Sequence, residues 1–235
     1  MAEMMHGIGA FALYVAPLVV ILIAVRRFSR IPDELFRKLL HFVLLGAYPV
    51  LLYAFEHWYM LVIFATLLIA LFYPAFMLLG RIPQFSAFVN ERKAGEFKSS
   101  LVLAMLVLSV SAAICWGWLG DRLLVIACIY AWGIGDGLAA LVGKRFGRHK
   151  VKLRLADGHK SWEGTATMFT AAFLSVLIVL LMRGGLGAVP CAAIALIAAA
   201  VTAFVELCAT GGMDTVLCPA AAMAAILPLV HLFGG

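Results

Sequence analysis

Eight long runs of apolar residues dominate this sequence and decide which class of fold it can adopt. Each run is near the ~20 residues that an α-helix needs to cross the hydrocarbon core of a bilayer. Spanning segments must satisfy their backbone groups internally, so the sequence predicts an all-α, polytopic membrane bundle of about eight transmembrane helices. The predicted spans are roughly 7–25, 38–55, 59–80, 101–119, 123–143, 162–182, 187–210 and 215–233.

The composition excludes a soluble domain. Of the 235 residues, 65% are hydrophobic and 13% are charged, and the mean hydropathy is +1.08. A soluble chain of this length needs far more polar residues to cover its surface. No run alternates apolar and polar residues over about ten positions, as the strands of a membrane β-barrel do. We therefore expect one helical membrane domain over residues 1–235.

The five cysteines and the first apolar run are both interpreted as structural. The cysteines lie in apolar runs at irregular spacing, without a CxxC pair that would suggest zinc or redox chemistry. The first run begins within MAEMMHGIGA, which lacks the positively charged segment of a signal peptide. We expect it to be a retained transmembrane helix.

Basic residues are distributed asymmetrically among the loops. Only Arg122 and Arg183 follow even-numbered runs, whereas the other sixteen of the 18 lysines and arginines follow odd-numbered ones. Because cytoplasmic loops are enriched in lysine and arginine, the odd-numbered loops are predicted to be cytoplasmic and both termini outside. The net charge of +6 is thus largely a topology signal, and nothing in the pattern suggests nucleic acid as a partner. Most of the acids that are costly to bury fall near the same membrane face, where we expect the function.

Asp136 lies inside the fifth apolar run, within AWGIGDGLAALVGKRFG. A carboxylate within a span costs on the order of 2.5–3.5 kcal/mol on insertion scales, so it usually faces a bundle interior or a wet cavity. Helical spacing places Asp136, Ala140 and Lys144 on one stripe and small residues on the next. These small residues either pack against neighbouring helices or leave clearance for a hydrated Mg²⁺ and phosphates.

The basic loop that follows ends in HKSWEG. Such a loop either binds anionic lipid and sets the topology or binds a nucleotide. Lys160 and Ser161 favour the second interpretation, because they directly precede a predicted helix whose free backbone N–H groups attract anions. The lysine would supply a point charge and the serine a hydroxyl donor for a phosphate.

A second basic group, in IPDELFRKLLHF, opens the second run. Arg37 and His41 are four residues apart and share a helix face, and Lys38 lies beside it. These side chains are either anchors at the membrane interface, with His41 satisfied inside the bundle, or a cluster that binds phosphates.

Two further acids, Glu206 and Asp214, flank a glycine pair in ELCATGGMD, which permits a tight turn between the last two runs. An acid near a helix end often reaches toward water or caps the helix. If the turn folds back toward Asp136, three carboxylates and the basic loop would form a metal–polyphosphate site. Mg²⁺ is commonly held by one or two carboxylates together with substrate phosphates.

The motifs RKLLHF, GEFKSS, GDGLAALVGKRFG and HKSWEG, followed by Glu206 and Asp214, resemble the polyprenol kinase family in their order along the chain. The resemblance extends from about Arg37 to Pro219. The family includes dolichol, phytol and farnesol kinases and a CTP-dependent diacylglycerol kinase. The resemblance implies an integral-membrane kinase that uses CTP, or another nucleoside triphosphate, to phosphorylate a lipid alcohol.

We therefore expect phosphoryl transfer from CTP to a lipid alcohol of the isoprenoid type, with Mg²⁺ as cofactor, at the cytoplasmic face of the membrane. The alcohol would enter sideways from the bilayer. Nothing in the sequence decides between a monomer and a homodimer. The expected metal ligands are Asp136, Glu206 and Asp214. The expected catalytic residues are Asp136, Lys160 and His41, and the expected nucleotide-binding residues are Arg37, Lys38, Lys144, Arg145, Lys160, Ser161 and Glu163.

Three alternatives stay open at the level of sequence. The chain is also similar to CTP-dependent phosphatidate cytidylyltransferases, but ATGGMDTVLCP replaces the C-terminal Lys-Asp pair and PGHGG run of those enzymes. An ion-coupled transporter could use Asp136 and Glu206 as ligands, yet no internal repeat is evident and the polar groups cluster at one face rather than at the midplane. A purely structural or lipid-binding membrane protein would leave the buried acids unexplained.

Overall fold

The computed structural model describes residues 1–29, 31–79, 96–151, 160–210 and 212–234. Eight of its helices are long and apolar enough to cross a membrane, which confirms the predicted fold class. Over the described ranges the β-structure is limited to one isolated bridge between Lys150 and Ser161. The elements are α1 (Ala2–Phe28), α2 (Asp33–Ala54), α3 (Trp58–Leu79), α5 (Glu96–Ser111), η1 (Ala112–Trp118), α6 (Arg122–Phe146), α7 (Trp162–Arg183), α8 (Ala188–Cys208) and α9 (Asp214–Leu232).

The π-helix η1 continues α5 without a break, and the two together form one membrane span over Ser99–Trp118. The basic residues predicted between the third and fourth spans, other than Lys98, lie in 80–95, outside the described residues. Most of the acid-and-base-rich segment before Lys160, residues 152–159, lies outside them as well.

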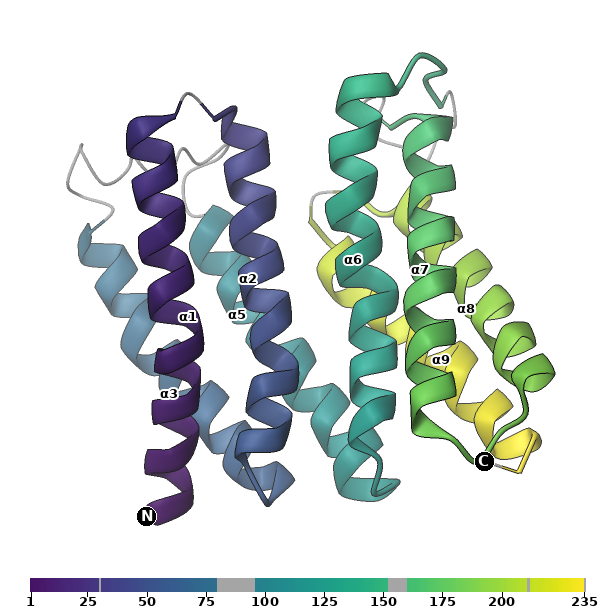
Figure 1. Cartoon of the computed structure of the whole chain (residues 1–235), viewed down its shortest axis with the longest axis horizontal. Helices are drawn as coiled ribbons and strands as arrows, with labels where there is room; N and C mark the ends of the chain where they lie inside the picture. Colours follow the sequence, from purple (N-terminus) through teal and green to yellow (C-terminus); the bar gives the residue numbers. More distant parts are fainter. Residues whose placement is uncertain (30, 80–95, 152–159, 211, 235) are drawn as a thin grey trace.

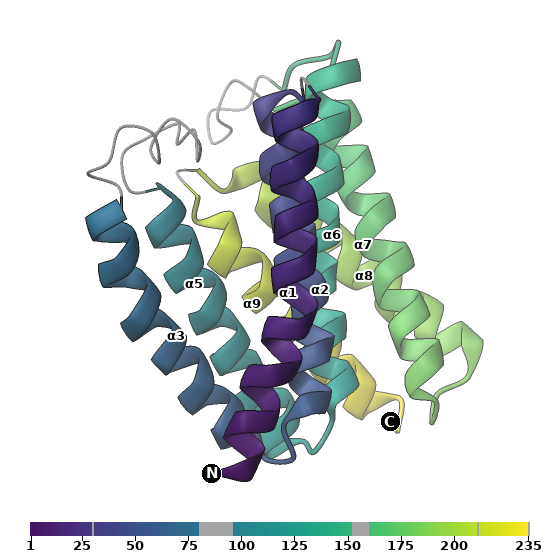
Figure 2. The ribbon, with the colours of Figure 1, turned by 60° about the vertical axis from the view of Figure 1, so that its left-hand side comes forward.

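Helix α6 lies at the centre of the bundle. It packs most extensively against α7 and also contacts α2 and α9. Helices α1, α2, α3 and α5 lie on one side of it and α7 and α8 on the other, and α9 passes behind it (Figure 1). The two chain termini lie at one end of the bundle, and the α1–α2, α6–α7 and α8–α9 connections lie at the opposite end (Figures 1 and 2). We call this opposite end the loop end.

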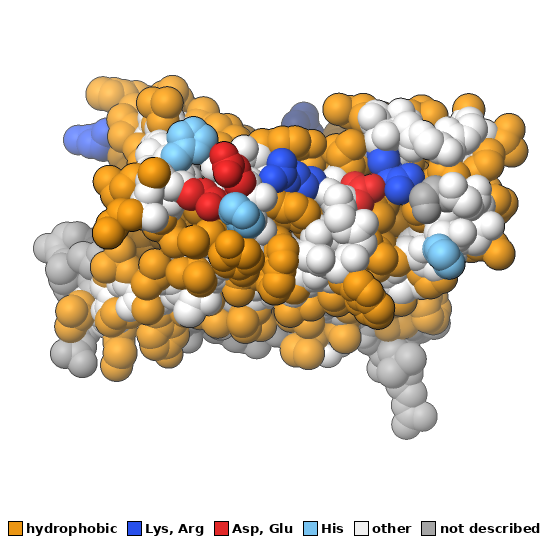
Figure 3. All heavy atoms as spheres, turned by 90° about the horizontal axis from the view of Figure 1, so that it is seen from below, with side chains coloured by type: hydrophobic (Ala, Val, Ile, Leu, Met, Phe, Trp, Pro, Cys, Tyr) orange, Lys and Arg blue, Asp and Glu red, His pale blue; other side chains and the backbone are white. Residues whose placement is uncertain are grey.

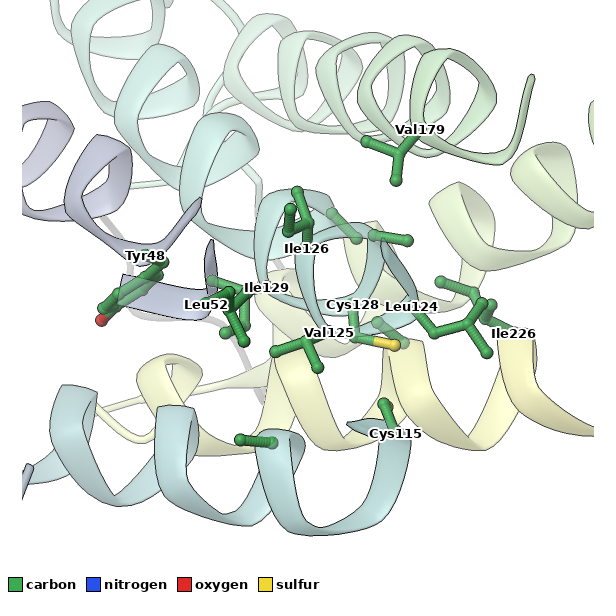
Figure 4. Close-up of a cluster of buried hydrophobic side chains, with 14 of the residues drawn as sticks. Tyr48, Leu52, Cys115, Leu124, Val125, Ile126, Cys128, Ile129, Val179 and Ile226 are labelled. Atoms are coloured by element: carbon green, nitrogen blue, oxygen red, sulfur yellow. The ribbon is translucent and has the colours of Figure 1, made fainter. Parts of the chain in front are cut away.

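The main hydrophobic core surrounds the first half of α6. Its side chains Leu124, Val125 and Cys128 lie in one cluster with Cys115 of η1 and Ile226 of α9 (Figure 4). Four of the five cysteines, including Cys115 and Cys128, are buried, and all five are free thiols. Burial of small, soft side chains in a tightly packed core agrees with the structural role expected for them.

The glycines of α6 let neighbouring helices approach closely. A Cβ atom at Gly133 would lie 2.4 Å from Leu45, and one at Gly137 would lie 2.4 Å from Phe42, both on α2. At Gly135 the corresponding atom would meet Met168 of α7 at 2.2 Å. The helix-packing interpretation is therefore confirmed for these three positions. Clearance for a metal-bound phosphate is the wrong interpretation of them, because protein side chains fill the space.

Charged side chains at the end that carries the termini are neutralised in local pairs. The carboxylate of Glu3 accepts hydrogen bonds from the backbone N–H groups of Glu56 and His57, each at 2.9 Å. Asp121 lies 2.5 Å from Arg183 and also caps the first turn of α6. The red and blue side chains of this end lie within a largely hydrophobic surface (Figure 3). The remaining buried charges of the described chain lie toward the loop end.

Candidate active site at the loop end of the bundle

Two lysine–carboxylate pairs form the centre of a polar cluster at the loop end, which we define as Lys38, His41, Asp136, Lys160, Glu206 and Asp214. The first pair joins α2 to α6: Nζ of Lys38 donates a hydrogen bond to Oδ2 of Asp136 at 2.7 Å. Both side chains are largely buried, with 11% and 20% of their surfaces exposed. Asp136 lies ten residues before the end of α6, or about 15 Å along the helix axis. A charge at this depth is stabilised by its partner, because an unpaired buried carboxylate is costly.

The second pair joins the segment before α7 to the end of α8. Nζ of Lys160 lies 3.0 Å from Oε1 of Glu206, and it also donates to the backbone carbonyls of Glu206 and Ala209. A lysine at the C-terminus of a helix satisfies carbonyl groups that have no partner within the helix. The backbone on either side is held in place, since the N–H of Val151 donates to the carbonyl of Lys160 at 3.0 Å.

Asp214 begins α9 and completes the set of three acids. Its carboxylate is within electrostatic range of Asp136, Lys38 and Lys160, and Glu206 is within range of both other acids. The turn between α8 and α9 thus folds back toward Asp136, which is the condition that a site with three carboxylates requires. With two lysines against three carboxylates, the cluster gathers opposite charges from five parts of the chain: α2, α6, the segment before α7, the end of α8 and the start of α9.

These carboxylates suit a hard divalent cation in their chemistry, since Mg²⁺ prefers oxygen ligands. Among the described residues, no three histidine, cysteine, aspartate or glutamate side chains lie close enough to form a complete metal cage. Mg²⁺ often takes one or two carboxylates from a protein and its other ligands from phosphates and water, a mode that needs no such cage, and the expected ligands remain a prediction. Asp136 and Glu206 would be the protein ligands in this mode, with Asp214 nearby.

His41 lies one helical turn deeper in the membrane than Lys38. Its Nε2 atom is 2.9 Å from the carbonyl oxygen of Gly133. Because a carbonyl only accepts hydrogen bonds, Nε2 must carry a proton, and in a neutral ring Nδ1 then keeps the lone pair. The ring also packs edge-to-face on Trp132, with centroids 5.4 Å apart. His41 is therefore held in one orientation, with one nitrogen left to accept a proton.

Comparison with known proteins identifies the family of the chain. A protein named phytol kinase, from Synechocystis sp., is 32% identical to this chain over 181 residues, which cover 74% of this chain and 70% of that protein. The chain belongs to the polyprenol kinase family. It is accordingly a phosphotransferase that acts on an alcohol, and more specifically a membrane-embedded kinase of a lipid alcohol. No protein-family model and no solved structure matches the chain.

Three basic residues expected to bind nucleotide lie farther out on the kinase, near the water. Arg37 and Lys144 flank the buried carboxylate of Glu34, with nitrogen–oxygen distances of 3.9 Å and 3.8 Å. Arg145 is exposed, and its guanidinium lies over the ring of Phe146 at 5.4 Å. The structure thus separates these residues from the polar cluster and places them at its outer rim.

Ser161 and Glu163 have structural partners in the kinase. The Oγ atom of Ser161 accepts a hydrogen bond from the N–H of Gly164 at 3.2 Å, so Ser161 is the N-cap of α7. The carboxylate of Glu163 accepts hydrogen bonds from the backbone N–H groups of Arg148 and His149 and pairs with the His149 ring at 2.7 Å. Both side chains fix the base of the loop that delivers Lys160. Their expected contact with a nucleotide remains a prediction.

Glu34 and Trp132 are the residues of this site that sequence reasoning missed. Glu34 lies three residues before Arg37 in the motif IPDELFRKLLHF, and it is 7% exposed and faces two basic side chains. The sequence around Trp132 indicates only a core position, and the residue is 4% exposed. A signal for it does exist in the sequence, because Trp132 and Asp136 are four residues apart and so share a helix face.

Proposed function

We propose that this kinase transfers the γ-phosphoryl group of CTP to the hydroxyl of an isoprenoid alcohol, at the cytoplasmic face of the membrane and with Mg²⁺. The observation that carries the proposal is the pairing of Lys38 with Asp136 and of Lys160 with Glu206 at the boundary between the membrane and the loops. Phytol, the substrate that names the Synechocystis relative, is the acceptor that we would test first.

The two ion pairs suggest how the site receives its nucleotide. A triphosphate brings several negative charges, and each lysine exchanges its carboxylate partner for a phosphate oxygen. Each carboxylate that is released becomes available to the cation that accompanies the nucleotide. Bound by Asp136 and Glu206, Mg²⁺ would neutralise charge on the β- and γ-phosphates. The exchange leaves none of the four charges of the two ion pairs without a partner, which a site at membrane depth requires.

The residues then have separate tasks during transfer. Lys38 and Lys160 hold the transferring phosphoryl group and offset its charge, since phosphoryl transfer depends mainly on positioning and electrostatic stabilisation. Nδ1 of His41 accepts the proton of the hydroxyl as the alcohol oxygen forms a bond to the γ-phosphorus. The bond from this phosphorus to the β–γ bridging oxygen breaks, and CDP leaves with the electron pair. Arg37 and Lys144, at the rim, would contact the nucleotide farther from the reaction.

The depth of the polar cluster in the bundle indicates from which side each substrate enters. The polyprenyl tail stays among the apolar helices, and the nucleotide arrives from the water at the loop end. Arg26 and Arg27 in the last turn of α1, and Arg148 and Lys150 after α6, share this end, and such residues are enriched on the cytoplasmic side.

Purified protein in nanodiscs, supplied with γ-labelled CTP, ATP, GTP or UTP and with phytol, farnesol, a long polyprenol or diacylglycerol, tests the proposal. We expect label in an isoprenoid alcohol, with CTP as the best donor. Chelation of divalent cations should abolish the transfer and added Mg²⁺ should restore it. Transfer from ATP alone, transfer to diacylglycerol alone, or full activity in the chelator would contradict the corresponding part of the proposal.

A further inference from the structure

Helices α2 and α6 are joined by two side-chain pairs, one above the other. The ion pair Lys38–Asp136 lies nearer the loop end. The aromatic pair His41–Trp132 lies deeper, because α2 runs into the membrane from Lys38 to His41 and α6 rises from Trp132 to Asp136. The offsets of three and four residues correspond to about one helical turn on each helix. A lipid alcohol that approaches from the bilayer meets the aromatic pair before it meets the ion pair.

The deeper pair contains a hydrogen-bond donor without an acceptor. Nε1 of Trp132 is buried, and no acceptor for it is present among the residues that the structure describes. A buried N–H group that makes no hydrogen bond costs about 1–3 kcal/mol, and buried indole N–H groups usually find a partner. The indole belongs to a small buried cluster with Ala139, Met168, Ala203 and Cys218, and the one polar group among these side chains, the Cys218 thiol, donates to the carbonyl of Thr202 at 3.9 Å. The unused donor lies on the same face of α6 as Asp136.

We infer that the indole N–H of Trp132 donates a hydrogen bond to the hydroxyl oxygen of the acceptor alcohol. The inference rests on the proposed function, which it deepens by naming the group that binds the reacting hydroxyl. The alcohol oxygen has two lone pairs and one proton. One lone pair accepts from Trp132, the other forms the bond to the γ-phosphorus, and the proton goes to Nδ1 of His41. Trp132 and His41 together thus fix the hydroxyl beneath the ion pair.

This arrangement selects for a hydroxyl over an apolar chain end. A tail without a hydroxyl leaves the Trp132 N–H and Nδ1 of His41 without a hydrogen bond from the ligand, and a site that has to leave such groups unpaired discriminates strongly against that ligand. The rest of the acceptor contacts apolar side chains, which discriminate weakly among tails of similar width.

Indole N–H signals provide a readout that does not depend on turnover. The chain has five tryptophans, so ¹⁵N-tryptophan labelling gives five indole N–H signals, and Trp132→Phe identifies one of them by its loss. Titration with phytol, without nucleotide, should shift that signal, whereas phytane, the hydrocarbon without the hydroxyl, should not. An unmoved signal, or an equal shift with both compounds, would overturn the inference.

Trp132→Phe also has a kinetic consequence. The ring is retained and the N–H is removed, so KM for the alcohol should rise about tenfold, the effect of one lost hydrogen bond, while KM for CTP stays unchanged. Trp118→Phe is the matched control, because Trp118 is 83% exposed and lies in η1 near the opposite end. An unchanged KM for the alcohol in Trp132→Phe would contradict the inference.

A second variant covers the case in which Trp132→Phe does not fold. Replacement of Trp58, Trp116, Trp118 and Trp162 by phenylalanine leaves Trp132 as the single indole and does not alter the site. The proposed function and the role of Trp132 can also be refuted independently of each other. A phytol-dependent shift without phosphorylation by any nucleotide would refute the proposed function alone. Phosphorylation of phytol without the shift would refute the role of Trp132 alone.

Discussion

Asp136 and Asp121 occupy matched environments at opposite ends of the bundle. Asp136 is 20% exposed and lies 2.7 Å from Lys38, and Asp121 is 19% exposed and lies 2.5 Å from Arg183. Breaking either pair leaves a partly buried charge without its partner, which costs several kcal/mol when burial is complete. The two acids therefore contribute similarly to stability, and only Asp136 belongs to the polar cluster.

Substitution of each of these two aspartates separates an effect on catalysis from an effect on stability. Asp136→Asn should lower phosphoryl transfer on the order of 10³-fold or more, because the residue lies where charge must be neutralised. Asp121→Asn should destabilise the protein by a similar amount and keep most of its activity. Melting temperatures and rates measured on both variants in the same nanodiscs check the prediction. Near-normal turnover by Asp136→Asn would refute its assignment.

His41 has a proton-acceptor role that pH can reveal. His41→Gln keeps an N–H group that can donate to the carbonyl of Gly133, but it has no basic nitrogen. We expect kcat to fall about 10²-fold or more, since a positioned base contributes this much. The wild-type rate should fall as the pH drops through the range in which histidine gains a proton, and the variant should lose this dependence. His57→Gln, at the opposite end, is the control and should keep the wild-type pH profile.

At the scale of elements, the hydropathy of the sequence predicts the helices well, because each span must be apolar over its whole length. The eight predicted runs correspond to the eight helices of the structure within a few residues. Ser161 likewise lies at the predicted helix start and caps α7. The spacing of residues along one helix does not predict which other helix packs against that face. The fit of Gly137 against Phe42 and the pairing of Asp136 with Lys38 depend on how α2 lies against α6.

The C-terminal end of α6 is the element most sensitive to added bulk. A Cβ atom at Gly147 would lie 2.1 Å from the backbone oxygen of Gly143 and 2.6 Å from Oγ of Ser161. Neither the helix carbonyl nor the N-cap can move without disturbing the base of the loop that holds Lys160. We therefore expect that the connection between α6 and α7 does not tolerate a side chain at position 147.

Gly147→Ala tests this expectation. It should destabilise the protein by about 1–3 kcal/mol, the usual cost of overpacking, and should lower activity together with stability. Gly9→Ala is the control: no atom lies within 4 Å of its Cβ position on α1, so it should be neutral or slightly stabilising. Thermal unfolding of the two variants measures the difference, and an equal effect at both positions would contradict the packing described here.

At the scale of the whole molecule, the cluster and most of the described basic residues share one end of the bundle. We predict that this end is cytoplasmic, because lysine and arginine are retained on that side of the membrane. Cysteine introduced at Arg148 should react with a membrane-impermeant maleimide only after permeabilisation, and cysteine at Leu119 should react in intact cells. Both positions are exposed, and Cys208, the one native cysteine that is not fully buried, is replaced by alanine in the background. The reverse labelling pattern would invert the proposed topology.

The sequence also left a choice between a kinase and a cytidylyltransferase, which differ in the bond that breaks in CTP. Membership in the polyprenol kinase family decides for phosphoryl transfer to an alcohol, while the donor remains a proposal. The fate of each phosphorus atom of CTP tests both at once.

The most direct measurement uses CTP labelled at either the α- or the γ-phosphorus, with purified protein, Mg²⁺ and phytol. We predict that γ-label appears in phytyl phosphate, that α-label stays in CDP, and that both products form in equal amounts. Asp136→Asn should give neither product, and Asp121→Asn should give both. Release of pyrophosphate with α-label in the lipid, or no transfer of γ-label from CTP to any alcohol, would contradict the account.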